Sequence, residues 1–95
     1  MQINIKVNFY ENFRHIAGKD SEIFTCAADT TLEDFVARLL PEKYGNQFRK
    51  LLFDEKDNIH RALLILVNGE VVKDTSSFKL SDNDEITILL PVAGG

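Results

Sequence analysis

The sequence predicts a single α+β domain, in which one mixed sheet of four to five strands has one main helix packed across it. Three observations carry this prediction. Apolar and polar side chains alternate over residues 3–9, a helix start with apolar residues at helical spacing follows at residues 30–40, and two more strand patterns lie near the end of the chain. A chain of 95 residues, 44% of them hydrophobic, has room for one core.

The first strand is predicted from strict alternation. The residues expected on its buried face are Ile3, Ile5, Val7 and Phe9. Residues 11–17 should then form a short helix that buries Phe13 and Ile16, and Gly18 is suited to end it because glycine adopts positive φ without strain. A second strand over residues 22–27 is expected to return antiparallel to the first.

The main helix has a recognisable start. Thr30 as N-cap with Glu33 three residues later is a capping box. The apolar residues that follow at helical spacing are Leu32, Phe35, Val36, Leu39 and Leu40. Pro41 either ends this helix or begins the next turn, because proline is tolerated in a first turn. A second helical segment is expected between residues 42 and 58, with an apolar stripe of Tyr44, Phe48, Leu51 and Leu52.

The last third of the chain predicts three strands. The continuous apolar run over residues 63–67 is typical of a central strand. Asn68-Gly69 predicts a type I′ hairpin turn, because both central residues of that turn need positive φ, and residues 70–72 form the returning strand. After a turn at residues 81–84, the final strand over residues 85–90 should direct one set of side chains to a single face, namely Ile86, Ile88 and Leu90.

Charge and composition exclude several function classes. The net charge is −4, and no cluster of Lys and Arg forms a phosphate-binding surface, so nucleic acid is not an expected partner. The longest apolar run, residues 62–67, is too short to span a bilayer, and no signal peptide is recognisable at the start. We therefore expect no membrane association and a cytoplasmic location. The single cysteine, Cys26, fits a reducing compartment and is expected to be a buried apolar residue.

No local motif predicts catalysis by the chain itself. His15 and His60 have no cluster of further ligands near them in the sequence, so no metal site is expected, and no phosphate-binding glycine loop is present. The acidic groups in residues 54–57 and 82–85 are predicted to be solvated loops. An apolar docking patch on the sheet is also expected. Phe48 and Phe53 are candidates for it, although aromatic residues at helical spacing are more often part of a core.

The most specific feature is the end of the sequence. Pro91 lacks the N–H that a sheet needs, so the final strand should end there, and five residues at ~3.3–3.6 Å each reach about 17 Å. Gly94 and Gly95 have no Cβ and therefore fit a narrow channel. We predict a domain over residues 1–90 and a flexible tail that enters a partner's active site, with a frayed end as the alternative. The recognition residues expected in the tail are Pro91, Val92, Ala93 and Gly94.

These features together resemble one known family. The segments that carry the resemblance are residues 9–18 (FYENFRHIAG), 67–69 (VNG), 82–86 (DNDEI) and 89–95 (LLPVAGG). Together with the order of elements, they are similar to the MoaD/ThiS family of ubiquitin-like sulfur carriers. The resemblance covers most of the chain. The long stretch over residues 41–61 resembles the longer subgroup, which includes archaeal-type MoaD proteins and carriers for cysteine biosynthesis, and Phe13 stands where many members carry Leu.

The resemblance implies a β-grasp fold and a carrier without catalytic residues or bound cofactor. An E1-like adenylating enzyme would use ATP to activate Gly95, and a sulfur donor such as a cysteine desulfurase or rhodanese would convert it to a thiocarboxylate. The acceptor enzyme expected first is the large subunit of molybdopterin synthase. Three alternatives stay open: a carrier for cysteine or thiamine biosynthesis, a ubiquitin-like modifier joined to target lysines through Gly95, and a plain interaction module.

Overall fold

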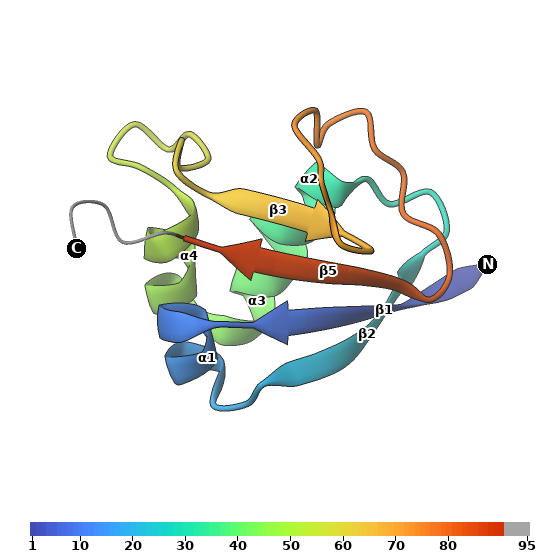
Figure 1. Ribbon diagram of the computed structural model, residues 1–95, viewed down its shortest axis with the longest axis horizontal. Helices are drawn as coiled ribbons and strands as arrows, with labels where there is room; N and C mark the ends of the chain where they lie inside the picture. The colour runs from blue at the N-terminus through green and yellow to red at the C-terminus, as the bar shows by residue number, and fades with distance from the viewer. Residues whose placement is uncertain (91–95) are drawn as a thin grey trace.

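The computed structural model describes residues 1–90 and shows a five-stranded mixed sheet covered on one face by helices (Figure 1). The strand order is β2-β1-β5-β3-β4, with β5 in the centre and parallel to β1, while the other neighbours are antiparallel. The strands are β1 (Gln2–Phe9), β2 (Ser21–Ala27), β3 (Leu64–Val67), β4 (Glu70–Val71) and β5 (Asp84–Leu89). The predicted α+β architecture is confirmed. Within the described residues, no helix combines the length and the apolar character needed to cross a membrane.

One helical run crosses the sheet and is flanked by two shorter helices. The elements are α1 (Glu11–Ala17), α2 (Leu32–Asp34), the π-helical turn η1 (Phe35–Leu39), α3 (Leu40–Tyr44) and α4 (Asn46–Leu52). Because α2, η1 and α3 follow one another without a break, they form the predicted main helix. Two glycines with positive φ end segments of this layer, Gly18 after α1 at 76° and Gly45 after α3 at 89°. The second helical segment is confirmed as α4, but it is shorter than the window over residues 42–58.

The core lies between the sheet and the helices. The alternation in β1 is confirmed, since every second side chain from Ile3 to Phe9 is buried. The ring of Phe48 on α4 makes an edge contact with Phe9 at 6.0 Å between ring centroids and a tilted contact with Phe13 at 5.0 Å. Aromatic pairs of this kind stabilise by about 0.5–1.5 kcal/mol beyond the area they bury. Phe48 is therefore a core residue that ties α1 and α4 to β1, and not part of a docking patch.

The main helix begins one residue later than predicted. Thr31, not Thr30, is the N-cap, and its hydroxyl oxygen accepts a hydrogen bond from the N–H of Asp34 at 3.1 Å. The reason is long-range: the carbonyl of Thr30 accepts the N–H of Leu80, so tertiary contacts hold Thr30 outside the helix. Two neighbouring threonines have equal capping chemistry, and only their distant partners distinguish them.

Pro41 explains the π-helical turn. Inside an α-helix a proline lacks the N–H that would bond four residues back, and its ring clashes with that carbonyl. Here the turn before Pro41 is widened, and the N–H of Leu40 donates to the carbonyl of Phe35, five residues back. Pro41 therefore stands in the first turn of α3 and does not end the helical run, which settles the alternative left open by the sequence.

The hairpin at Asn68-Gly69 is confirmed, with φ of 53° and 86°. The strand before it is an inner strand, as predicted, but it is not buried on both faces. β3 lies between β5 and β4, and its alternate residue Leu64 is 39% exposed. An unbroken apolar run suggests burial on both faces, but only one face of β3 meets the core, through Ile65 and Val67. The other face of β3 is an apolar surface, with consequences for the site described below.

A buried carboxylate joins this hairpin to β5. Asp84 was predicted to lie in a solvated loop, but it is only 9% exposed. Its Oδ1 accepts a hydrogen bond from Nδ2 of Asn68 at 2.9 Å, and its Oδ2 accepts the N–H of Ser81 at 2.8 Å. The Oδ1 of Asn68 in turn accepts the N–H of Glu85 at 3.0 Å. The prediction that Asp84 is solvated is therefore wrong, because each of its carboxylate oxygens accepts a hydrogen bond from the protein in place of water.

We predict that Asp84→Ala lowers the free energy of unfolding by about 1–3 kcal/mol, because it leaves the N–H of Ser81 and the amide of Asn68 without their acceptor. Urea unfolding monitored by circular dichroism measures this. The exposed Glu70→Ala serves as a control and should change stability by less than about 0.5 kcal/mol. Equal effects of the two substitutions would contradict the assigned role of Asp84.

A second ionic cluster connects β2 to the helical layer. The carboxylate of Glu22 contacts the ammonium groups of Lys19 and Lys43, and its side chain is only 13% exposed. The hydrogen bond from Lys19, followed by that from Lys43, lowers the pKa of Glu22 from 4.5 to about 2. Burial raises the pKa of the nearby Tyr44 hydroxyl, and the negative charge of Glu22 raises it further. The cluster is thus built around an ionised Glu22.

This cluster makes stability depend on pH. Because the pKa of Glu22 is about 2 when folded and near 4.5 when unfolded, the unfolded chain binds the proton more readily. The contribution of Glu22 is therefore complete above pH 4.5 and is lost as pH falls towards about 2. We predict that the difference in unfolding free energy between the wild type and Glu22→Gln is largest at pH 7 and vanishes near pH 2. A constant difference across urea titrations at pH 7, 4 and 2 would refute this.

Candidate functional site

The predicted site residues, Pro91 to Gly95, lie outside the described residues, so the structure shows the surface from which they follow. β5 ends at Leu89, which pairs with Leu64 at the start of β3. Because β1 runs parallel to β5, with Phe9 opposite Ile88, the end of β1 and the following α1 lie at the same end of the sheet. The end of α4 is held nearby, since the carbonyl of Leu52 accepts the N–H of His60 at 2.7 Å. α1, α4 and the loop over residues 53–63 thus gather around the end of β5 (Figure 1).

The open face of the sheet has an apolar region at this end. Leu64 pairs with Leu89, and Leu66 pairs with Val71, so these side chains share the face opposite the helices. Leu64 and Val71 are 39% and 51% exposed, unusually high for large apolar residues. We call this surface the apolar patch; it consists of Leu64, Leu66, Val71 and Leu89. Apolar side chains gathered in this way on a small domain mark a contact site for another protein.

Polar side chains on β5 and β1 give the apolar patch a boundary. Next to Leu66, the central strand carries Thr87, and β1 carries Asn8 opposite it. The Nδ2 of Asn8 donates to Oε2 of Glu85 at 2.5 Å. A docking patch on the sheet was predicted with Phe48 and Phe53 as candidates, whereas the strand register assigns the patch to β3, β4 and β5. The sequence signal that locates it is the unbroken apolar run of β3, whose second face is not covered by any element within residues 1–90.

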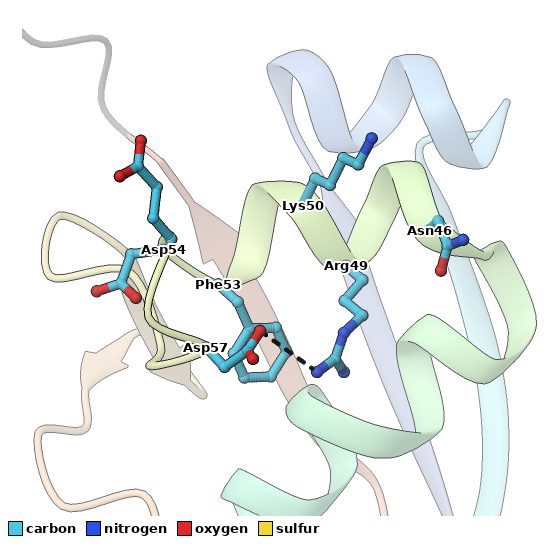
Figure 2. Close-up of a pocket in the computed structure, with 7 residues that line it drawn as sticks. Asn46, Arg49, Lys50, Phe53, Asp54 and Asp57 are labelled. Atoms are coloured by element: carbon cyan, nitrogen blue, oxygen red, sulfur yellow. Dashed lines mark ion pairs between the residues drawn. The ribbon is translucent and has the colours of Figure 1, made fainter.

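A hollow of about 400 Å³ lies on α4, in the helical layer (Figure 2). In it, the guanidinium of Arg49 lies over the ring of Phe53, 4.5 Å from the centroid, and 4.0 Å from a carboxylate oxygen of Asp57. Lys50 points away from this pair, as Figure 2 shows. Of the two aromatic residues predicted as candidates for the docking patch, Phe53 is therefore the one that stays partly accessible. The full lining is Asn46, Arg49, Lys50, Phe53, Asp54, Glu55 and Asp57.

The loop that forms one wall of this hollow is internally ordered. The Oδ1 of Asp54 accepts the N–H groups of Lys56 at 2.8 Å and Asn58 at 3.0 Å, and Phe53 bridges to Ile59. Residues 55–58 are exposed, as predicted for a solvated loop. Asp54 is different, because it is an acceptor at the centre of the turn and thereby shapes the hollow.

The other chemistry-bearing residues lie apart from this surface or are occupied. Cys26 is buried on β2, and burial raises the pKa of its thiol, which fits the predicted apolar role. The Nδ1 of His60 accepts the N–H of Ala62 at 3.2 Å, and His15 is exposed on α1. Over residues 1–90 there is no group of three or more His, Cys, Asp or Glu side chains placed to hold a metal ion.

A mixed five-stranded sheet that holds a helix on one face, with its last strand in the centre, defines a ubiquitin-like β-grasp protein. The chain belongs to the ThiS family, whose model matches residues 7–95. The family of ubiquitin-like sulfur carriers and modifiers suggested by the sequence is therefore confirmed. Its members are small carrier proteins and not catalysts.

Relatives with known names agree with this assignment. The chain is 32% identical to small archaeal modifier protein 3 of Haloferax volcanii, over 98% of this chain and all of that protein. It is 24% identical to the molybdopterin synthase sulfur carrier subunit of Chlamydomonas reinhardtii, again over 98% of this chain and all of the relative. The solution structure of small archaeal modifier protein 1 from Methanosarcina acetivorans superposes with a TM-score of 0.75 at 29% identity, covering 100% of this chain and 99% of that one.

Proposed function

We propose that this protein is a sulfur carrier whose terminal Gly95 is adenylated by an E1-like enzyme and converted to a thiocarboxylate. The observation that carries the proposal is that the ThiS family model matches the chain through residue 95, so the Gly-Gly end belongs to the family pattern. The fold supports it, because the last strand ends beside an exposed apolar patch. No residue of the body needs to act on the reacting carbonyl.

The proposed chemistry requires activation because a carboxylate is a poor electrophile. The Gly95 carboxylate oxygen attacks the α-phosphorus of ATP on the activating enzyme, which forms an acyl-adenylate and releases pyrophosphate. A persulfide or sulfide sulfur supplied by a desulfurase or a rhodanese then attacks the carbonyl carbon, and AMP leaves. When a persulfide is the donor, a thiol of the partner reduces the acyl disulfide to the thiocarboxylate. ATP is consumed by the partner, and this chain binds no cofactor of its own.

The apolar patch is proposed as the surface that the activating enzyme binds. A tail of five residues reaches about 17 Å at full extension, so the enzyme must hold the body of the carrier close to its own active site. The apolar patch begins at Leu64 and Leu89, where β5 ends, and is therefore placed for that contact. Asn8 and Glu85 lie on the same face of the sheet as the apolar patch and give it a polar rim.

The proposed acceptor of the sulfur is the large subunit of molybdopterin synthase. The support is the relative from Chlamydomonas reinhardtii, which is named as the sulfur carrier subunit of that enzyme and matches over its full length. In this role the carrier is a co-substrate: its thiocarboxylate delivers sulfur in the active site of the large subunit and returns as a carboxylate.

A second candidate function is protein modification. The relative from Haloferax volcanii is named as a modifier and is 32% identical over its full length. The same acyl-adenylate would then be formed, but a lysine amine of a target protein attacks the Gly95 carbonyl and an isopeptide bond results. The two functions differ in the nucleophile that completes the reaction.

We predict that incubation with ATP, the matching E1-like enzyme and a sulfur source increases the intact mass by the difference between sulfur and oxygen. The gain should localise to Gly95 by fragmentation, since the terminal carboxylate is the proposed reaction site. A chain lacking Gly95 is the control and should show no gain. An unmodified wild-type carboxylate under conditions in which the same enzyme activates another carrier would refute the sulfur-carrier proposal. Gly-Gly remnants on lysines of proteins purified with the tagged carrier would instead support the modifier function.

The apolar patch can be tested in the same assay. We predict that Leu64→Asp or Val71→Asp lowers kcat/KM for adenylation by at least about tenfold, because a charge in an apolar contact costs more than 1 kcal/mol. Gln2→Asp makes the same charge change at the opposite end of β1 and should leave adenylation unchanged. Both patch variants should keep the wild-type circular dichroism spectrum because their side chains are outside the core. Wild-type adenylation by both would show that the enzyme binds elsewhere.

A further inference from the structure

The pairing of the strands leaves the start of β3 without a neighbour on one side. β4 has two residues and covers only the last part of β3, where Glu70 pairs with Val67. One further bond continues this ladder, from the N–H of Val72 to the carbonyl of Ile65 at 2.9 Å. No strand within residues 1–90 pairs with β3 beyond this bond, and β3 is the outermost labelled strand on that side of the sheet in Figure 1.

The N–H of Ile65 points to this open edge. In an antiparallel ladder the N–H and C=O of one residue are directed to the same side, and the carbonyl of Ile65 faces the edge. The alternate residues bond to β5 instead, as the N–H of Asn68 does to the carbonyl of Glu85 at 2.8 Å. No hydrogen bond within residues 1–90 uses the N–H of Ile65, although this residue is only 4% exposed. Buried N–H groups without an acceptor are rare in folded proteins, so this one favours an occupant that supplies a carbonyl.

A groove of about 430 Å³ lies along this part of β3, and we call it the β3 groove. Its lining includes Ile65 itself, so the unbonded N–H lies at the groove. Leu64 and Val71 of the apolar patch also line it, and the β3 groove therefore continues the apolar patch around the edge of the sheet. Because Leu64 pairs with Leu89, the groove lies at the end of the sheet where β5 ends.

Two cations without ion-pair partners lie on the β3 groove. Arg61 and Lys73 both line it, and both are exposed. None of the ion pairs within residues 1–90 involves either side chain. The lining contains one carboxylate, that of Glu33, so the groove is positively charged, whereas the whole chain has a net charge of −4. The β3 groove therefore attracts negative charge, although the molecule as a whole repels it.

We propose that the β3 groove binds an extended acidic segment of a partner protein. The backbone of the segment adds to the edge of β3, and one of its carbonyls accepts the N–H of Ile65. An apolar side chain of the segment packs on Leu64 and Val71, and acidic side chains lie beside Arg61 and Lys73. The unbonded N–H requires an acceptor, the apolar lining requires an apolar side chain, and the two unpaired cations require negative charge. An extended acidic segment supplies all three.

This binding goes beyond the proposed function and does not depend on the reaction at Gly95. A partner held at the β3 groove stands near the end of β5, from which the tail follows, but binding itself needs neither ATP nor an activating enzyme. A chain that lacks Gly94 and Gly95 should therefore bind the segment as well as the wild type does, although it has no glycine to be adenylated. Failure of the segment to bind and failure of sulfur transfer are thus separate results.

The test is an NMR titration of the full chain with two capped synthetic peptides, a short run of valines flanked by aspartates and the same run flanked by lysines. The aspartate peptide should bind at least about tenfold more tightly, and salt should weaken its binding. The amide proton of Ile65 should shift downfield, because a new hydrogen bond deshields it. Equal affinity for both peptides, or the largest amide shifts outside residues 61–73, overturns the proposal. Shifts at Ile65 that follow protein concentration without peptide would identify a second copy as the occupant and also overturn it.

Variants then locate the charges. Arg61→Glu and Lys73→Glu should each weaken binding of the aspartate peptide severalfold, because each replaces an attracting cation by a repelling carboxylate. Lys6→Glu makes the same charge change at an exposed position of β1 and should leave binding unchanged. Equal weakening by all three substitutions would show that the charge of the whole chain, and not the β3 groove, governs binding. The wild-type titration needs no variant, so a variant that fails to fold does not remove the test.

Discussion

The parallel pairing of β1 with β5 is the constraint on which the rest of the structure depends. It joins the two ends of the chain at the centre of the sheet, with Val7 beside Ile86 and Phe9 beside Ile88, all four fully or almost fully buried. Parallel neighbours require a long connection, and the helices and hairpin between them are that connection. Because β1 and β5 run in the same direction, α1 and the end of β5 lie at one end of the sheet. The surface proposed for recognition exists there for this reason.

The two ends of β5 are built differently. At its start, Asp84 and Asn68 exchange hydrogen bonds that fix the strand to the β3–β4 turn. At its end, Leu89 pairs with Leu64, and among residues 1–90 no side-chain hydrogen bond fixes the strand there. Rigidity at one end and an open surface at the other suit the proposed carrier function, because a partner can hold the body firmly at the open surface.

Local patterns predicted most of the elements, and long-range contacts account for what they missed. The alternation of β1 and the chemistry of Asn68-Gly69 are properties of a few adjacent residues, and both predictions are confirmed. Whether Thr30 or Thr31 caps the helix is decided by Leu80, which lies 50 positions away in the sequence. The burial of Asp84 and the exposure of Leu64 likewise follow from strand order. The tail was predicted from its own residues, but the residues of the apolar patch could be identified only from the register of three strands.

The same strand order divides the open face of the sheet into an apolar and a polar part. The apolar patch lies over β3, β4 and the end of β5, and the polar residues Asn8 and Glu85 lie beside it on β1 and β5. An activating enzyme that docks on the apolar patch therefore meets a polar rim along one side. The two parts differ in their response to salt. Salt screens contacts between exposed charges over about 10 Å at 0.1 M, so contacts at the rim weaken with ionic strength, whereas apolar docking at Leu64 depends little on it.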